Sequence, residues 1–189
     1  MKKTVGVLAL QGDFEAHQRA LKGVGADAVQ VRTPEELARV QGLIIPGGES
    51  STMLKLLDET GMMQPLRDFA AEQPVFGTCA GAILVAKEVS NPVQDVLGVM
   101  DIGVERNAYG RQLDSRIVNL KPEGMAGGDL EAVFIRAPII RRVGDGAKVL
   151  ARYNGDPVLV EQGRHLAATF HPELTPDLRV HELFLSKIK

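Results

Sequence analysis

The first 90 residues alternate between short apolar segments and segments whose apolar residues recur at helical spacing. This alternation restricts the fold more than any other feature of the sequence. Strands are expected over residues 4–10, 28–31, 42–45 and 74–78, because these runs are apolar and are bounded by glycine, proline or polar turns. Such regular alternation is typical of a mostly parallel sheet with helices on both faces. We therefore predict an α/β fold.

The pattern changes after Val89, where shorter strands and turns replace the alternation. We interpret this region as a short antiparallel extension and expect the chain to return as a strand at residues 165–170. The complete prediction is a flavodoxin-like three-layer sandwich that forms a single domain over residues 1–189. Helices are expected over residues 14–24, 35–39, 52–59, 64–72, 80–88 and 177–188, and strands of the extension over 99–104, 116–120, 130–136, 149–153 and 158–162.

The composition is that of an ordinary globular protein, with 44% hydrophobic residues, 24% charged residues and a net charge of −2. This charge provides no basic surface for nucleic acid, and no apolar run approaches the roughly 20 residues of a membrane-spanning helix. The single cysteine cannot form an intrachain disulfide, and the first residues do not read as a signal peptide. We expect a cytoplasmic protein without nucleic-acid or membrane partners. No G-x-G-x-x-G turn and no metal-ligand spacing occur, so we predict neither a dinucleotide cofactor nor a metal.

The single cysteine lies in the segment Gly77-Thr78-Cys79-Ala80-Gly81, where a strand is expected to meet a helix. A side chain in such a turn is pushed clear of the sheet, and flanking glycines let neighbouring backbone approach closely. The positive end of the following helix favours the thiolate, which is the nucleophilic form of cysteine. The alternative is that Cys79 is a small hydrophobic residue of the core, as most free cysteines are.

A second turn whose residues could take part in binding or catalysis follows the strand at residues 42–45 and contains Gly47, Gly48 and Glu49. Two glycines before serines that could cap a helix leave backbone N–H groups unshielded, which suits an anion or a developing oxyanion. The alternative is an ordinary glycine-rich turn with a serine N-cap. Ligands of parallel sheets bind beyond the carboxyl ends of the strands, so the turns that contain Gln11, Gly48 and Cys79 should share one crevice.

Four histidines are candidates for a base that serves Cys79. His17 and His181 lie in expected helices and His165 opens a strand, so each is expected to be at the surface or structural. His171 differs because it directly follows a strand and precedes a proline, which favours an extended conformation. In an extended chain Glu173 points to the same side, so its carboxylate can reach the imidazole and fix its tautomer.

A polar turn without function is the alternative interpretation of the segment His171-Pro172-Glu173. Glu49 also lies in the expected crevice. We interpret it as a binding or helix-end group and not as the acid that orients the histidine.

The sequence resembles the class I, or triad, glutamine amidotransferases, which combine a G-x-C-x-G elbow with a distant H-P-E. Here these motifs are Gly77-Thr78-Cys79-Ala80-Gly81 and His171-Pro172-Glu173. The resemblance is closest to the branch that serves as the glutaminase subunit of pyridoxal 5'-phosphate synthase and extends over residues 5–184. The segments that carry it are LALQGDFEAH, PGGESSTM, ERNAYGRQLDS, FIRAP and FHPELTPDLRVHELF.

This resemblance implies a Cys79, His171 and Glu173 triad that hydrolyses L-glutamine and passes the ammonia to a separate synthase subunit. It also implies that Gln11 completes the site when the synthase docks. The glutamine pocket would include Gly47, Gly48, Glu49, Arg106, Ile135 and Arg136, with Gly48 and Ala80 at the oxyanion hole.

The chain departs from the branch at Arg116 and at the pair Arg141-Arg142, which adds charge to an expected loop. These departures lie outside the triad. Three alternatives stay open: the same chemistry in the service of another synthase, a glutamine-binding regulatory subunit without catalysis, and a cysteine hydrolase that acts without a partner.

Overall fold

The computed structural model describes residues 1–108 and 115–189 and centres on a seven-stranded sheet. The strand order is β10-β11-β12-β4-β3-β1-β2, and the five strands from β12 to β2 are parallel. The predicted α/β fold with a mostly parallel sheet is therefore confirmed. The strands are β1 (Thr4–Leu8), β2 (Asp27–Val31), β3 (Gly42–Ile45), β4 (Val75–Thr78), β10 (Lys148–Tyr153), β11 (Asp156–Gln162) and β12 (His165–Ala168).

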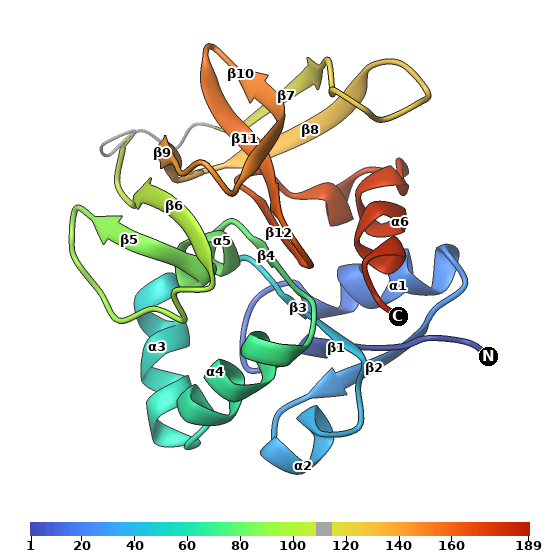
Figure 1. Cartoon of the computed structure of the whole chain (residues 1–189), viewed down its shortest axis with the longest axis vertical. Coiled ribbons are helices and arrows are strands. Elements are labelled where there is room, and N and C mark those ends of the chain that lie inside the picture. Colours follow the sequence, from blue (N-terminus) through green and yellow to red (C-terminus); the bar gives the residue numbers. More distant parts are fainter. Residues whose placement is uncertain (109–114) are drawn as a thin grey trace.

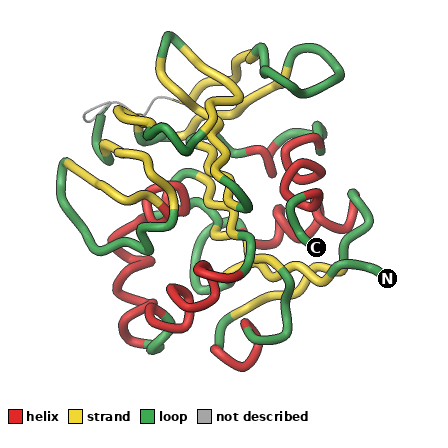
Figure 2. Tube along the Cα trace, in the orientation of Figure 1, coloured by secondary structure: helices red, strands yellow, loops and turns green. Residues whose placement is uncertain are grey.

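Helices cover both faces of this sheet (Figures 1 and 2). On one face α1 and α6 lie side by side, and on the other face lie α3, α4 and the buried α5, with α2 at the sheet's β2 edge. No helix among the described residues is long and apolar enough to cross a membrane. The helices are α1 (Phe14–Gly23), α2 (Pro34–Leu37), α3 (Ser50–Glu59), α4 (Met63–Glu72), α5 (Ala80–Val85) and α6 (Arg179–Ser186), with a short 3-10 helix at Pro172–Leu174.

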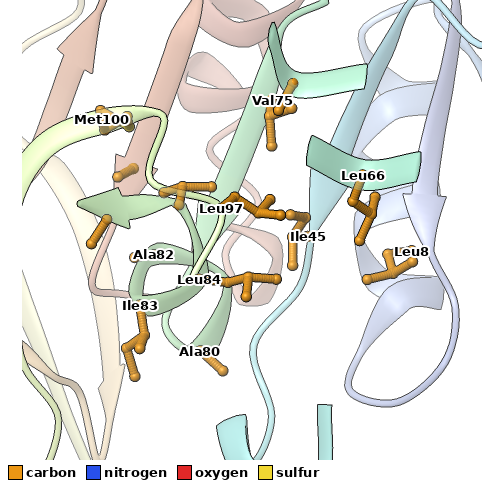
Figure 3. Close-up of a cluster of buried hydrophobic side chains, with 14 of the residues drawn as sticks. Leu8, Ile45, Leu66, Val75, Ala80, Ala82, Ile83, Leu84, Leu97 and Met100 are labelled. Atoms are coloured by element: carbon orange, nitrogen blue, oxygen red, sulfur yellow. The ribbon is translucent and has the colours of Figure 1, made fainter. Parts of the chain in front are cut away.

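Each face of the sheet has its own hydrophobic core, because successive strand residues point to opposite sides. In β3, Ile44 packs with α1 and α6, whereas Leu43 and Ile45 pack with the helices of the other face. Figure 3 shows this second core, in which Leu66 of α4 and residues of α5 surround Ile45. Because every residue of α5 is buried in this core, the turn that precedes α5 is anchored to the core at its end.

The ends of two helices next to the sheet are set by acidic caps. The Asp13 carboxylate accepts a hydrogen bond from the Ala16 N–H at 3.4 Å and caps α1. At α3 the cap is Glu49, not a serine: its carboxylate accepts from the N–H groups of Ser51 and Thr52. The serine cap considered from sequence is therefore wrong, because a longer side chain just before the helix satisfies both N–H groups.

The region after α5 forms two smaller sheets in addition to the antiparallel strands β10 and β11. The helix expected over residues 80–88 ends at Val85, because the next residues pair in parallel with a strand 14 residues further on. Arg141 and Arg142, expected in a loop, lie instead on a strand that was not predicted. The additional strands are β5 (Ala86–Ser90), β6 (Met100–Glu105) and β9 (Ile139–Val143) in one sheet, and β7 (Ser115–Leu120) and β8 (Leu130–Ile135) in the other.

Candidate active site

The turns that follow β1, β3, β4 and β12 meet at the carboxyl edge of the central sheet. A side-chain carbon at Gly47 would lie 2.6 Å from Cε1 of His171 and 3.1 Å from Cβ of Cys79. The Gln11 side chain packs against Gly48, and its Oε1 accepts a hydrogen bond from the Glu49 N–H at 3.2 Å. The structure therefore brings together the four turns singled out in the sequence.

Cys79 occupies a strained turn between β4 and α5. Its φ of 51° and ψ of −106° are unusual for a residue with a side chain, and such strain is characteristic of functional turns. Its N–H donates to the Ala168 carbonyl at 2.9 Å, which ties the turn to β12. Gly77 and Gly81 permit this turn because a Cβ on either would overlap backbone atoms, those of Gly81 and Ile45 respectively. The residue is only 7% exposed, so the thiol is presented to a cavity and not to bulk solvent.

His171 and Glu173 form a short buried contact of 2.6 Å between Nδ1 and Oε1. The side chain of Glu173 is fully buried, and that of His171 is 11% exposed. The two were expected to meet in an extended chain. Instead, Pro172–Leu174 forms a 3-10 helix directly after His171, and this helix brings the carboxylate back to the imidazole.

The pKa of His171 depends on its two partners, Cys79 and Glu173. Burial lowers the pKa of His171, but hydrogen bonds from the imidazolium to Cys79 and Glu173 outweigh this effect and raise the pKa to about 10. His171 is therefore charged at neutral pH while both partners are in place.

A cavity of about 350 Å³ opens in front of Cys79 and His171. Ile135 places its carbonyl oxygen 4.0 Å from the Cys79 Sγ, and Arg136 follows with a φ of 45°. Arg106 donates from Nη2 to the Ser51 hydroxyl at 2.9 Å. The lining contains Gly48, Glu49, Ser50, Cys79, Ala80, Ile83, Arg106, Asn107, Ile135, Arg136, Pro138 and His171.

Most of the residues that the resemblance implies for the pocket line this cavity. Gly47 is not part of the lining and lies behind it, against Cys79 and His171. Ser50, Ile83, Asn107 and Pro138 also line the cavity and were not singled out from sequence. The part of the ERNAYGRQLDS motif at residues 109–114 lies outside the described residues.

The Glu49 carboxylate forms its hydrogen bonds with the first turn of α3. Hydrogen bonds from the Thr52 hydroxyl and from the Ser51 and Thr52 N–H groups lower the pKa of Glu49 to about 2, although partial burial opposes the shift. The carboxylate is therefore an anion at neutral pH, and its oxygens hold the start of α3.

Two histidines expected to be at the surface or structural are completely buried behind the site. His17 and His181 have no exposed surface, and Nδ1 of His17 lies 2.9 Å from Nε2 of His181. Nε2 of His17 in turn approaches Glu173. A signal for this burial was present in the sequence, because Ala16, Ala20 and Leu21 flank His17 on the buried face of α1.

The described residues contain no group of three or more histidine, cysteine or acidic side chains that could hold a metal ion. The site thus consists of a cysteine in a strand-to-helix turn, a charged histidine and a buried glutamate at the edge of a parallel sheet. This combination defines an α/β protein with a cysteine triad of the type that performs acyl transfer.

Comparison with known proteins narrows this class. The chain belongs to the SNO glutamine amidotransferase family, whose sequence model matches residues 7–189. A relative from Solibacter usitatus, named pyridoxal 5'-phosphate synthase subunit PdxT, is 61% identical over 98% of this chain and 100% of its own length. A relative of the same name from Koribacter versatilis is 58% identical over 98% of this chain and 95% of its own length.

Solved structures agree with this assignment. A glutamine amidotransferase crystal structure is 52% identical, with a TM-score of 0.90 over 97% of each chain. The PurLQS structure from Thermotoga maritima has a TM-score of 0.79 over 100% of each chain at 16% identity, so it supports the fold alone.

Proposed function

We propose that this chain is the glutaminase subunit of a pyridoxal 5'-phosphate synthase. It hydrolyses L-glutamine to glutamate and ammonia and passes the ammonia to the synthase subunit, which makes pyridoxal 5'-phosphate. The observation that carries the proposal is the identity of 61% over the whole length of a relative that bears the name of a subunit of that synthase. We propose a single amidotransferase domain over residues 1–189. We also propose a cytoplasmic location, because a catalytic free thiol requires a reducing compartment.

The first chemical step uses the pair of Cys79 and His171. The Cys79 thiolate attacks the side-chain carbonyl carbon of glutamine and forms a tetrahedral intermediate. Backbone N–H groups near Gly48 and Ala80, both in the cavity wall, would stabilise the oxyanion. The His171 imidazolium gives its proton to the amide nitrogen, the C–N bond breaks, and ammonia leaves a thioester on Cys79.

The second step hydrolyses the thioester. Once Cys79 is acylated, its negative charge no longer supports the imidazolium, so the pKa of His171 falls from about 10 toward the range of a base. His171 takes a proton from water, the resulting hydroxide attacks the thioester carbonyl, and glutamate leaves as the thiolate re-forms. Glu173 keeps Nδ1 of His171 protonated in both steps, which leaves Nε2 as the reactive nitrogen.

Glutamine itself is proposed to bind through Gly47, Gly48, Glu49, Arg106, Ile135 and Arg136. Among these, the Arg106 guanidinium can bind the α-carboxylate with two parallel hydrogen bonds. Because the Glu49 carboxylate is engaged in capping α3, we propose that Glu49 contributes through the position of its backbone.

Gln11 is proposed to couple the site to the synthase subunit. Its Oε1 accepts from the Glu49 N–H, and its buried Nε2 has no hydrogen-bond partner among the described residues. A buried amide that is half satisfied is costly. A docking partner that rearranges Gln11 would therefore move the loop of Gly48 and Glu49 at little cost.

The test is glutamate release from glutamine by the purified chain, alone and with a pyridoxal 5'-phosphate synthase subunit added, with Cys79→Ala as the blank. Strong activation that disappears in the variant is the expected result. High turnover that the partner does not change would contradict the coupling, and an absence of turnover in both cases would contradict the catalytic role.

A further inference from the structure

A chain of buried polar groups extends behind the triad into the core between α1 and α6. Oε1 of Glu173 contacts His171, and its Oε2 lies 3.4 Å from Nε2 of His17. The same Nε2 is 3.2 Å from the Thr78 hydroxyl oxygen, and Nδ1 of His17 is 2.9 Å from Nε2 of His181. His17, His181 and the Glu173 side chain are fully buried.

Oε2 of Glu173 needs a hydrogen-bond donor. Among the described residues no group satisfies it in hydrogen-bond geometry, although a buried carboxylate oxygen without a donor is costly. His17 is in a position to supply the donor, because its Nε2 lies only 3.4 Å from this oxygen.

The network assigns the tautomer of His17. With a proton on Nε2, the ring can donate to the Thr78 hydroxyl oxygen and toward Glu173, while its Nδ1 accepts from the Nε2–H of His181. The opposite tautomer would turn a lone pair toward the carboxylate. It would also force a proton onto Nδ1 of His181, which is buried and has no partner among the described residues. The first tautomer avoids both penalties.

His17 is also neutral. Burial is the main cause that lowers its pKa well below the usual value, and the nearby His181 and His171 add to the effect. Burial likewise lowers the pKa of His181 to about 4. A neutral donor satisfies Glu173 without neutralising it, so the negative charge stays available to the His171 imidazolium.

We propose that His17 is a positioning residue of the active site, which donates from Nε2 to Oε2 of Glu173 and so fixes the carboxylate against His171. His181 contributes by holding the tautomer of His17. This inference rests on the proposed glutaminase function. The competing explanation is that the two rings only fill the core, where both lie edge-on to Phe76.

The decisive comparison is between His17→Gln and His17→Met. The two side chains have similar length, but only glutamine offers an N–H to Glu173. We expect His17→Met to lower the kcat of the synthase-activated glutaminase by about tenfold to hundredfold, with KM for glutamine within twofold, because the catalytic carboxylate loses its alignment. His17→Gln should keep most of the wild-type kcat. His165→Met is the control, because His165 is a buried histidine that does not belong to the polar network behind the triad. This variant should leave kcat unchanged.

A second readout does not depend on glutamine. The pKa of His171, measured by NMR titration of its imidazole protons, should be lower in His17→Met than in wild type and in His17→Gln. Equal kcat and equal His171 pKa in the Met and Gln variants would overturn the inference, as would a tenfold loss of kcat in a folded His17→Gln protein. If wild-type protein with the synthase released no glutamate, the proposed function would fail, whereas the His171 titration would still decide the role of His17.

Discussion

Gly47→Ala should lower glutaminase activity without unfolding the protein, because this glycine lies directly against Cys79 and His171, the proposed catalytic pair. The new methyl group would lie 2.6 Å from Cε1 and 3.3 Å from Nδ1 of His171, and 3.1 Å from Cβ of Cys79. Carbon atoms in ordinary contact are roughly 3.5–4 Å apart. The imidazole must therefore retreat by about 1 Å. Such a misplacement of a catalytic group costs about 10² in rate, so we expect kcat to fall about a hundredfold.

The assay is glutamate release with the synthase subunit present, accompanied by thermal unfolding of each protein. Gly146→Ala is the matched control, because its methyl group would make only an ordinary contact of 3.5 Å with Nε2 of Gln162, far from the site in the turn before β10. Overpacking at Gly47 should also lower stability by about 1–3 kcal/mol. A folded Gly47→Ala protein whose kcat stays within threefold of wild type would refute the reasoning.

Three further predictions concern charge and packing near the site. Cys79→Ala should lower the pKa of His171 from about 10, because the hydrogen bond and charge of Cys79 help to raise it; NMR titration checks this, and an unchanged pKa would contradict it. The pKa of Glu49 is depressed to about 2, so its contribution to stability is present above its ordinary pKa of 4.5 and disappears as the pH falls through 2. In urea unfolding, Glu49→Gln should cost up to about 1 kcal/mol at pH 7, as for other helix caps, and this cost should vanish once the pH is below the Glu49 pKa of about 2; a difference that persists in stronger acid would show another cause. Gly81→Ala should lower the free energy of unfolding by roughly 3 kcal/mol in the same assay, because its methyl group would overlap the Ile45 carbonyl of β3. Near-wild-type stability would mean that α5 and β3 can move apart to make room for the methyl group.

The central sheet was predictable because its strands are short, apolar and separated by strong turn signals. The boundary after α5 was not, because the residues up to Val85 and those that follow form one continuous run of apolar residues and helix formers. Local periodicity cannot show that Ala86 pairs with Met100 in a parallel strand. Strand β9 was missed for a similar reason: two of its five residues are arginines, which form ion pairs with Glu105 and Asp101.

Cys79 and His171 could be predicted from the sequence as site residues, but the contact of His17 and His181 behind Glu173 could not. Glycines on both sides of Cys79 and a proline after His171 are local signals of special backbone, and the structure brings these two residues together. His17 and His181 carry no such backbone signal, and the apolar neighbours of His17 indicate only that it is buried. Their role depends on the packing of α1 against α6, which places two residues 164 positions apart in hydrogen-bond contact.

Two imidazoles approach the same carboxylate from opposite sides and take opposite protonation states. Burial acts to lower the pKa of both rings, but contacts with Cys79 and Glu173 reverse this effect for His171, whereas the neighbouring histidines lower the pKa of His17 further. The difference keeps the proton on the imidazole that faces the cavity, where the proposed mechanism delivers it to the departing amide nitrogen. A carboxylate placed at position 17 would lie beside Glu173 and would raise the pKa of one of the two acids, so that Glu173 could lose the negative charge that faces His171. The proposed role of His17 therefore requires that its ring be neutral, as its lowered pKa indicates.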